Sequence, residues 1–197
     1  MTSFRMRKIA KKKQEILRSA AAVLAEKGYH GTTMEEIAAN ILMTKGSMYY
    51  YFKNKDDLIY HCHQMIMEMS LERVEEAANS DLDPVEKQKM AIRGHILLAT
   101  EEKSMFNIMD KPYQKFSDEQ LAEVLELRRN YSHYYDRIIN EGIEKGVFET
   151  VDTKMIRFII LGALNGTFLW FSQEGPQTAE EVADAFSNYL LKMVEKK

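Results

Sequence analysis

A short run of hydroxyl-bearing and basic side chains has the chemistry needed to hold a nucleic acid. Such groups donate to phosphate oxygens or reach the edges of bases. Gly46 lies within the run and has no side chain, so its backbone can approach a duplex closely. The donors in this run are Thr44, Lys45, Ser47, Tyr49 and Tyr50.

Two short helices must position these groups. Thr33 is followed three residues later by Glu36, and this capping box predicts a helix that begins at Met34. Thr33 and Lys55 each stand at the start of a predicted helix, where free backbone N–H groups favour an anion such as phosphate.

The second helix carries most of the donors. Residues 41–43 form the turn, and Thr44 is a favourable N-cap for a helix over Lys45 to about Tyr50. Met48 and Phe52, four residues apart, are predicted to anchor this helix to the core, and for Tyr51 we also favour core packing. The pattern predicts a helix-turn-helix, which lays its second helix into the major groove of DNA.

The stretch from about Lys11 to Lys55 resembles the DNA-binding domain of the TetR family of transcriptional repressors. The family usually has Ala-Gly-Val in the turn. Here Leu42 replaces a Gly that often takes positive φ, so we expect a turn that is slightly strained or differently built. The matching residues are Ile16-Leu17-x-x-Ala20, Lys27-Gly28-Tyr29-x-x-Thr32-Thr33, Ile37-Ala38 and Thr44-Lys45-Gly46-Ser47-Met48-Tyr49-x-Tyr51-Phe52-x-x-Lys55.

The residues and the resemblance together predict a set of DNA contacts. The partner is double-stranded operator DNA, bound by a homodimer because a single recognition helix reads few bases. The predicted DNA-binding residues are Thr33, Thr44, Lys45, Gly46, Ser47, Tyr49, Tyr50 and Lys55.

The distribution of charge agrees with this prediction. The 197-residue chain has a net charge of −3, which by itself argues against a nucleic-acid partner. Residues 1–60, however, hold 11 Lys and Arg against 6 Asp and Glu, so residues 61–197 carry −8. This asymmetry between the two parts of the chain is the informative quantity.

Composition indicates a soluble, helical protein. The chain is 45% hydrophobic and 29% charged, with only three Pro and nine Gly. No apolar stretch reaches the length of a membrane span. Cys62 is the single cysteine, which excludes an internal disulfide and fits a reducing cytoplasm.

The predicted fold class is all-α with about nine helices. It comprises an N-terminal helix-turn-helix domain over residues 1–55 and a helical effector-binding and dimerisation domain over residues 56–197. Capping and breaking residues predict the helices, with an irregular stretch from Lys103 to Phe116. Beyond the first three, they run from Lys55 to about Ala78, Pro84 to about Thr100, Ser117 to Gly142 or Gly146, Asp152 or Thr153 to Gln173, and from Thr178 onward.

The C-terminal part resembles one branch of the same family, the regulators of lipid and steroid catabolism. Members of that branch commonly sense acyl-CoA thioesters, so the resemblance implies such an effector. Leu169 departs from the branch, which often has Arg there. The matching residues are Leu127-Arg128-Arg129-Asn130-Tyr131, Glu141-Gly142-x-x-x-Gly146, Leu161-Gly162-Ala163-Leu164-Asn165, Trp170 and Gly175-Pro176.

Methionine, aromatic and a few polar residues could line an adaptable effector pocket in this part of the chain. For most of them, however, plain core packing is the favoured interpretation. Arg128 could meet a phosphate or carboxylate, or pair with Glu126 or Asp118 at the surface. The candidates are Met65, Met69, His95, Phe106, Met109, Tyr113, Arg128, Tyr131, Tyr135, Asn165 and Trp170.

The last two predicted helices offer a dimer surface. Small residues there allow close helix–helix approach, and neighbouring aromatic residues supply apolar area for a two-fold four-helix bundle. The same positions could instead fill a subunit core. The predicted interface residues are Gly162, Gly166, Phe168 and Phe171.

Catalysis and metal binding are not predicted. His61-Cys62-His63 has metal-ligating side chains, but adjacent residues on a helix point in different directions and no fourth ligand is evident. No nucleophile elbow, P-loop or dinucleotide fingerprint is present, so we expect neither an enzyme nor a cofactor.

The leading prediction is a ligand-responsive repressor that a small hydrophobic or acyl-CoA-like molecule releases from a pseudo-palindromic operator. Two alternatives stay open at this point. One is a protein of this fold that a protein partner controls. The other is a small-molecule-binding or enzymatic helical bundle whose helix-turn-helix is vestigial.

Overall fold

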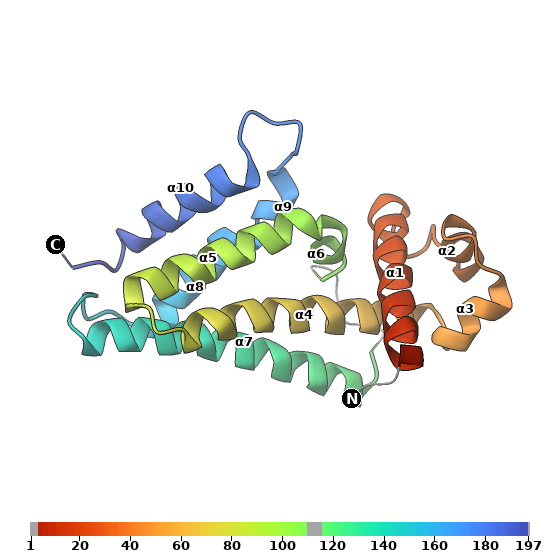
Figure 1. Cartoon of the computed structure of the whole chain (residues 1–197), viewed down its shortest axis with the longest axis horizontal. Helices are drawn as coiled ribbons and strands as arrows, with labels where there is room; N and C mark the ends of the chain where they lie inside the picture. Colours follow the sequence, from red (N-terminus) through yellow and green to blue (C-terminus); the bar gives the residue numbers. More distant parts are fainter. Residues whose placement is uncertain (1–3, 110–115, 197) are drawn as a thin grey trace. The chain divides into compact units, whose positions relative to one another are not determined.

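The computed structural model describes residues 4–109 and 116–196 and confirms the all-α prediction (Figure 1). The described residues form helical segments joined by short loops, with one isolated β-bridge between Phe148 and Glu195. The segments are α1 (Phe4–Lys27), α2 (Met34–Asn40), α3 (Lys45–Tyr51), α4 (Lys55–Asn79), α5 (Pro84–Glu101), α6 (Lys103–Met109), α7 (Asp118–Glu144), α8 (Thr153–Asn165), α9 (Thr167–Trp170) and α10 (Ala179–Leu191).

The chain divides into two compact units, which we describe separately. Unit 1 comprises residues 1–66 and 104–124, and unit 2 comprises residues 67–103 and 125–197. Both α4 and α7 contribute one part to each unit. The division at residues 55 and 56 into functional domains stays a prediction.

The core of unit 1 holds the two short helices in place. Ile16 of α1, Ile37 of α2 and Met48 of α3 are each 0% exposed, and Phe52 after α3 is 1% exposed. The predicted anchoring of the second helix by Met48 and Phe52 is therefore confirmed. Helices this short are marginal in water by themselves, so their stability comes from this buried apolar face.

The predicted helix starts are also confirmed. The Thr33 and Thr44 hydroxyls accept hydrogen bonds from the backbone N–H groups of Glu36 and Ser47, each at 3.2 Å. Thr178 and Glu181 form the predicted capping box at the start of α10. Each cap satisfies a backbone donor that the helix itself leaves unpaired.

Two predicted boundaries were wrong. The helix expected from Asp152 to Gln173 is broken at Gly166, which ends α8 and precedes the short α9. The stretch that was expected to be irregular contains the short helix α6. Met105 and Phe106 are each only 1% exposed, and the burial of their side chains stabilises this helix, which its local sequence does not favour.

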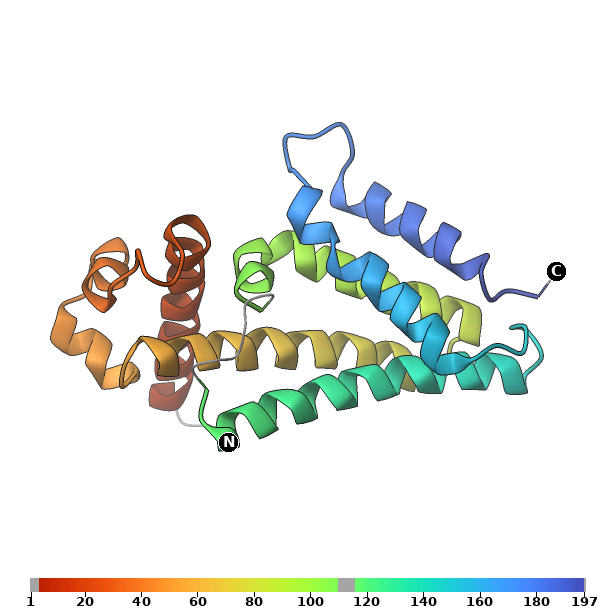
Figure 2. The same cartoon turned by 180° about the vertical axis from the view of Figure 1, so that it is seen from behind.

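Unit 2 is built around α5. Helices α8 and α10 both pack against α5, and Figures 1 and 2 show α10 running along it. Ile92 of α5, Leu164 of α8 and Ala183 of α10 are each 0% exposed and belong to this core. No helix within the described ranges is long and apolar enough to cross a membrane.

The end of α7 requires glycine twice. Gly146 has φ +71°, the left-handed conformation that glycine adopts without strain. A Cβ on Gly142 would lie 2.0 Å from the ring of Phe148, which is itself 2% exposed. The Gly142-x-x-x-Gly146 pattern thus lets Phe148 pack directly on the helix backbone.

Candidate nucleic-acid interface

Helix α3 presents a polar face to solvent. Tyr49 is 43% and Tyr50 is 70% exposed, whereas the neighbouring Met48 is fully buried. At the start of the helix, the Thr44 and Ser47 hydroxyl oxygens lie 2.9 Å apart. The structure therefore brings the predicted phosphate and base donors of α3 together on the side away from the core.

The packing around position 46 does not require a glycine. A Cβ placed on it would meet no atom within 4 Å, and its φ lies outside the left-handed region. The backbone at Gly46 is thus open to solvent at the start of α3. Such an open backbone is suited to close approach by a duplex.

The Lys45 ammonium forms a surface ion pair. It contacts the Glu35 carboxylate of α2, and the two side chains are 61% and 50% exposed. The hydrogen bond from Lys45 lowers the pKa of Glu35, and the same bond raises the pKa of Lys45. Because both groups face water, the pair is weak and the ammonium can exchange Glu35 for a phosphate.

Helix α2 begins beside a second ion pair. Thr33 caps α2, and its N3 residue Glu36 contacts Lys27 at the end of α1. The hydrogen bond from Lys27 lowers the pKa of Glu36. The ion pairs of Glu35 and Glu36 were not predicted from the sequence, although acidic residues are common in the first turn of a helix.

Lys55 has a structural role that the sequence did not suggest. Its ammonium donates to the backbone oxygens of Tyr29 at 2.5 Å and Thr32 at 2.7 Å, and it lies 3.9 Å from the centre of the Tyr29 ring. The Tyr29 hydroxyl in turn donates to Asp56 at 2.7 Å. The Lys55 side chain therefore fixes the loop between α1 and α2, and a DNA contact by Lys55 stays a prediction.

The turn between α2 and α3 is strained at Leu42. Leu42 has φ +53°, and no other non-glycine among the described residues has positive φ. Its side chain is 97% exposed and thus gains nothing from packing. The backbone N–H of Met43 donates to the Ala38 oxygen at 2.9 Å and closes the turn. The expected departure at this position is therefore real, and it takes the form of strain.

Replacing Leu42 with Gly will stabilise the protein. The left-handed conformation costs a side-chain-bearing residue about 1–2 kcal/mol. The greater freedom of Gly in the unfolded chain offsets about 0.4–1 kcal/mol of the relief. We expect a net increase of about 0.5–1 kcal/mol in the free energy of unfolding, measured by urea titration.

Leu42→Ala is the matched control. Alanine shortens the exposed side chain but keeps its Cβ, so it retains the left-handed strain. Its unfolding free energy should stay within about 0.5 kcal/mol of the wild-type value, as for most surface substitutions. Equal stabilisation by Ala and Gly would contradict the strain at Leu42.

Three of the effector candidates in unit 2 form one buried hydrogen-bonded chain. The His95 ring Nδ1 lies 2.7 Å from the Tyr131 hydroxyl, which lies 3.3 Å from the Tyr135 hydroxyl. The Tyr135 hydroxyl donates to the Ala91 backbone oxygen at 3.1 Å. Burial lowers the pKa of His95 to about 4 and raises the pKa of Tyr131 and Tyr135, so all three are neutral at pH 7.

The other effector candidates are distributed over both units. Asn165 is exposed, and Trp170 is 53% exposed and stacks on Phe186. Met69 is half-buried in unit 2, and Arg128 lines a surface hollow between α7 and α8. The candidates in unit 1 are Met65, Phe106 and Met109, and Tyr113 lies outside the described residues.

The dimer candidates fall in two groups. Phe168 and Phe171 are 4% and 5% exposed, so their side chains already belong to the core of unit 2. Gly162, by contrast, is exposed, and a Cβ there would meet open space. Gly166 is half-buried and is the C-cap residue of α8. Only the glycines thus stand near a free surface.

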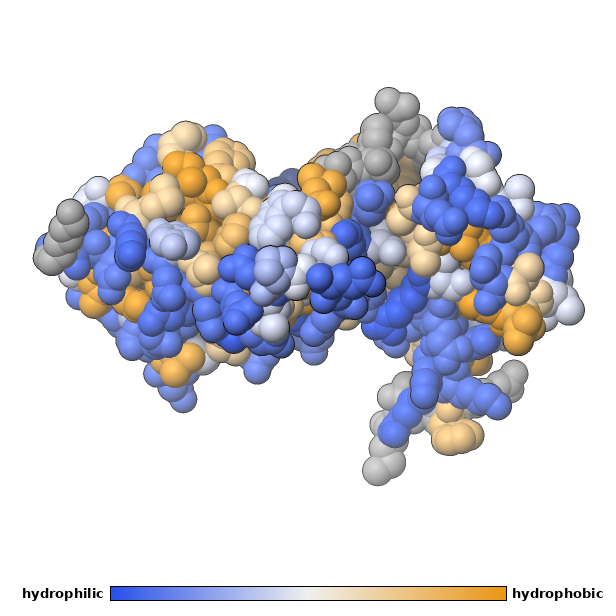
Figure 3. All heavy atoms as spheres, turned by 90° about the horizontal axis from the view of Figure 1, so that it is seen from above, coloured by the Kyte–Doolittle hydropathy of each residue, from blue (hydrophilic) through white to orange (hydrophobic). Residues whose placement is uncertain are grey.

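Helix α8 exposes three large apolar residues that are not among the predicted dimer residues. Met155 is 49%, Phe158 is 54% and Ile159 is 48% exposed, and with Gly162 they form one helical stripe, which we call the open α8 face. Figure 3 shows apolar surface gathered on unit 2. Their three- and four-residue spacing, opposite the buried Ile156 and Ile160, was the signal that sequence reasoning missed.

The side chains of the His61-Cys62-His63 run lie in different surroundings. Cys62 is buried, and burial raises the pKa of its thiol far above the usual range. The His61 Nε2 atom lies 3.8 Å from Asp57 Oδ1, and the His61 Nδ1 atom lies 3.4 Å from Lys13 Nζ. Among the residues that the structure describes, no three His, Cys, Asp or Glu side chains are grouped so that they could hold a metal.

Two short capped helices that hold a polar helix face to solvent define a helix-turn-helix protein, whose class binds DNA. The model of the bacterial regulatory proteins of the tetR family matches residues 16–62, and that of the tetracyclin repressor-like C-terminal domain matches residues 81–194. The chain belongs to the TetR family of DNA-binding transcriptional regulators. This family is one of regulators and not of enzymes.

Known relatives cover most of the chain. The fatty acid metabolism regulator protein of Bacillus subtilis is 28% identical over 79% of this chain and 81% of its own. The structure of the regulator PfmR from Thermus thermophilus has a TM-score of 0.83 and 28% identity, over 90% of this chain and 97% of that chain. AibR, solved with isovaleryl coenzyme A and operator DNA, has a TM-score of 0.78 and 27% identity, over 90% and 96% of the two chains.

Proposed function

We propose that this protein is a cytoplasmic, homodimeric repressor that an acyl-CoA thioester releases from a pseudo-palindromic operator. One observation carries the DNA-binding part of the proposal. Helix α3 buries Met48 completely and turns Lys45, Tyr49 and Tyr50 outward. The DNA contacts that we propose are those predicted from the sequence, namely Thr33, Thr44, Lys45, Gly46, Ser47, Tyr49, Tyr50 and Lys55.

The open α8 face supports the homodimer. Three large apolar side chains that are each about half exposed are more than a monomer needs to leave in water. Gly162 lies on the same stripe and lets a second helix approach closely. We therefore propose Met155, Phe158, Ile159 and Gly162 as the centre of a two-fold interface, in place of Phe168 and Phe171.

The relatives support the effector class. One relative is a fatty acid metabolism regulator, and AibR was solved with an acyl-CoA. Within unit 2, the buried chain of His95, Tyr131 and Tyr135 offers neutral hydrogen-bonding groups in an apolar core. Such groups suit the carbonyl oxygen of a thioester, which accepts hydrogen bonds and carries no charge.

Release requires that the effector bind the DNA-free conformation more tightly than the DNA-bound one. A ligand with equal affinity for both conformations shifts nothing. A roughly thousandfold fall in operator affinity requires that the free energies of effector binding to the two conformations differ by about 4 kcal/mol. The proposal thus demands reciprocal antagonism between acyl-CoA and operator.

Operator retardation in the presence of acyl-CoAs of increasing chain length tests this function. The operator is first selected from random duplexes with the purified full-length protein. We expect acyl-CoAs to release the DNA, while the matching free fatty acids do so only weakly. If no acyl-CoA changes operator binding, the effector class is wrong. If no specific duplex is selected at physiological salt, the DNA-binding function is wrong.

A further inference from the structure

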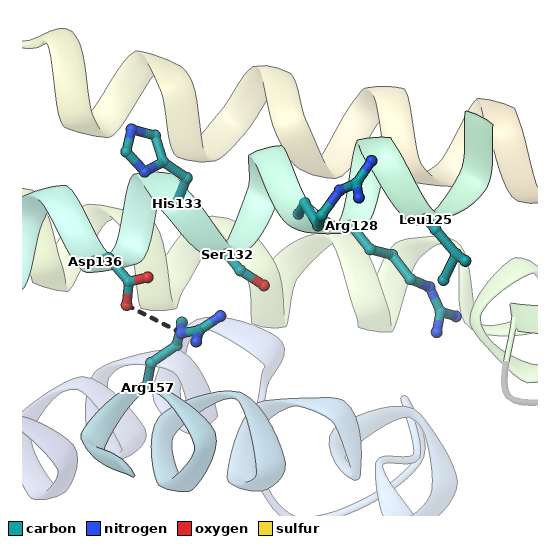
Figure 4. Close-up of a pocket in the computed structure, with 7 residues that line it drawn as sticks. Leu125, Arg128, Ser132, His133, Asp136 and Arg157 are labelled. Atoms are coloured by element: carbon teal, nitrogen blue, oxygen red, sulfur yellow. Dashed lines mark ion pairs between the residues drawn. The ribbon is translucent and has the colours of Figure 1, made fainter. Parts of the chain in front are cut away.

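A basic hollow lies on the surface of unit 2 between α7 and α8. It has a volume of about 370 Å³, and Figure 4 shows Arg157 reaching from α8 toward Asp136 on α7. The Arg157 Nε and Asp136 Oδ1 atoms are 3.0 Å apart. The residues that line the hollow are Leu125, Arg128, Arg129, Ser132, His133, Asp136 and Arg157.

The charge of this hollow is opposite to that of its surroundings. Unit 2, residues 67–103 and 125–197, holds 14 Lys and Arg against 20 Asp and Glu, a net charge of −6. Among the residues that line the hollow, however, three are arginines and only one, Asp136, which pairs with Arg157, is a carboxylate. A local field of this sign within an acidic unit attracts anions to one place.

The side chains suit phosphate more than a lone carboxylate. Each guanidinium presents a planar fork of donors that matches two oxygens of a phosphate. Arg128 and Arg129 come from α7, and Arg157 comes from α8, so arginines of two helices line the hollow. Ser132 points toward α8 between them and adds a hydroxyl donor (Figure 4). Several forks around one hollow fit a ligand that carries more than one phosphate.

We propose that this hollow binds the phosphate groups of a small organic polyphosphate, the chemical class of coenzyme A. The inference deepens the proposed function and rests on it, because it places the phosphate-bearing end of the effector at α7 and α8. Arg129 is the best single test, since its side chain is exposed and its removal leaves the ion pair of Arg157 with Asp136 intact.

Calorimetric titration of the full-length protein with lauroyl-CoA, coenzyme A, inorganic pyrophosphate and laurate tests the inference. In Arg129→Gln, the loss of one charge-assisted hydrogen bond should weaken lauroyl-CoA and coenzyme A about tenfold and leave laurate unchanged. Ser132→Glu, which puts a carboxylate into the hollow, should weaken the phosphate ligands by more than about tenfold. Binding of pyrophosphate with the same Arg129 dependence would assign the site to phosphate alone, without the rest of coenzyme A.

Arg137→Gln is the matched control. Arg137 lies on the same helix, is exposed and donates to Asn79 at 3.0 Å outside the hollow. This variant loses the same charge and should bind every probe as the wild type does. Wild-type affinity of Arg129→Gln and Ser132→Glu for coenzyme A, or no binding of any phosphate ligand to the wild type, would overturn the site.

Operator release, measured in parallel, separates this inference from the proposed function. Equal release of wild type and Arg129→Gln by lauroyl-CoA would overturn the phosphate site and leave the repressor function standing. Conversely, Arg129-dependent binding of coenzyme A without any release of operator would sustain the site and overturn the effector role.

Discussion

Phe158→Asp will dissociate the homodimer and abolish operator binding at nanomolar protein. Phe158 is 54% exposed at the centre of the open α8 face. Burying a phenylalanine contributes about 1.5–3 kcal/mol, and in a two-fold interface the loss occurs twice. The dimer should therefore weaken by about 3–6 kcal/mol, or roughly 150-fold to 25,000-fold, before the cost of burying a carboxylate is added.

Sedimentation equilibrium measures the dimer, and circular dichroism measures the fold. We expect Phe158→Asp to keep its helical signal and its thermal unfolding midpoint at protein concentrations where it is monomeric, because the side chain is not part of the core of one subunit. Leu82→Asp, which changes another half-exposed apolar residue at 45% exposure, should stay dimeric. A dimeric Phe158→Asp protein would show that copies associate through a different surface.

Lys45→Ala will weaken operator binding by about 30- to 150-fold without changing the dimer. Removing one charged donor to DNA costs about 1–1.5 kcal/mol, and the homodimer loses it at both half-sites, so the total is about 2–3 kcal/mol. The surface pair with Glu35 is also lost, but it contributes little to folding because both groups are exposed. Fluorescence anisotropy with a labelled operator measures the effect.

Salt dependence identifies the kind of contact. If Lys45 meets phosphate, the slope of log K against log salt should fall in magnitude by about 0.9 for each protomer. Lys145→Ala is the matched control, since Lys145 is 55% exposed and forms one surface ion pair with Glu141. Unchanged operator affinity of Lys45→Ala would remove Lys45 from the interface, and loss of affinity without a change in slope would assign it to a base edge.

Local patterns were sufficient to predict most of the helices in this chain. The caps at Thr33, Thr44 and Thr178 form as expected, because a cap depends on hydrogen bonds within one turn of the helix. The strain at Leu42 was also foreseeable, since only a residue without Cβ takes positive φ freely. Where the prediction failed at α6, the burial of Met105 and Phe106 decided the outcome.

The candidate sites divide in the same way. Tyr49 and Tyr50 of α3 point outward because the apolar Met48 and Phe52 hold the opposite side of the helix against the core. The spacing of four residues between Met48 and Phe52 predicts this orientation from the sequence. No comparable local pattern points to the role of the Lys55 ammonium, which binds the carbonyl oxygens of a loop 23 and 26 residues earlier. Contacts over such distances depend on the tertiary packing within unit 1.

The helical fold, the helix-turn-helix and the membership in the TetR family can all be inferred from the amino-acid sequence. These properties follow from periodicity, capping and short motifs, whose physics is local. The burial of Phe168 and Phe171 and the exposure of Phe158 and Ile159 depend instead on how the helices pack. The tertiary structure alone brought Arg129 and Arg157 from two helices around one hollow, because exposure and charge density depend on which helix faces pack together.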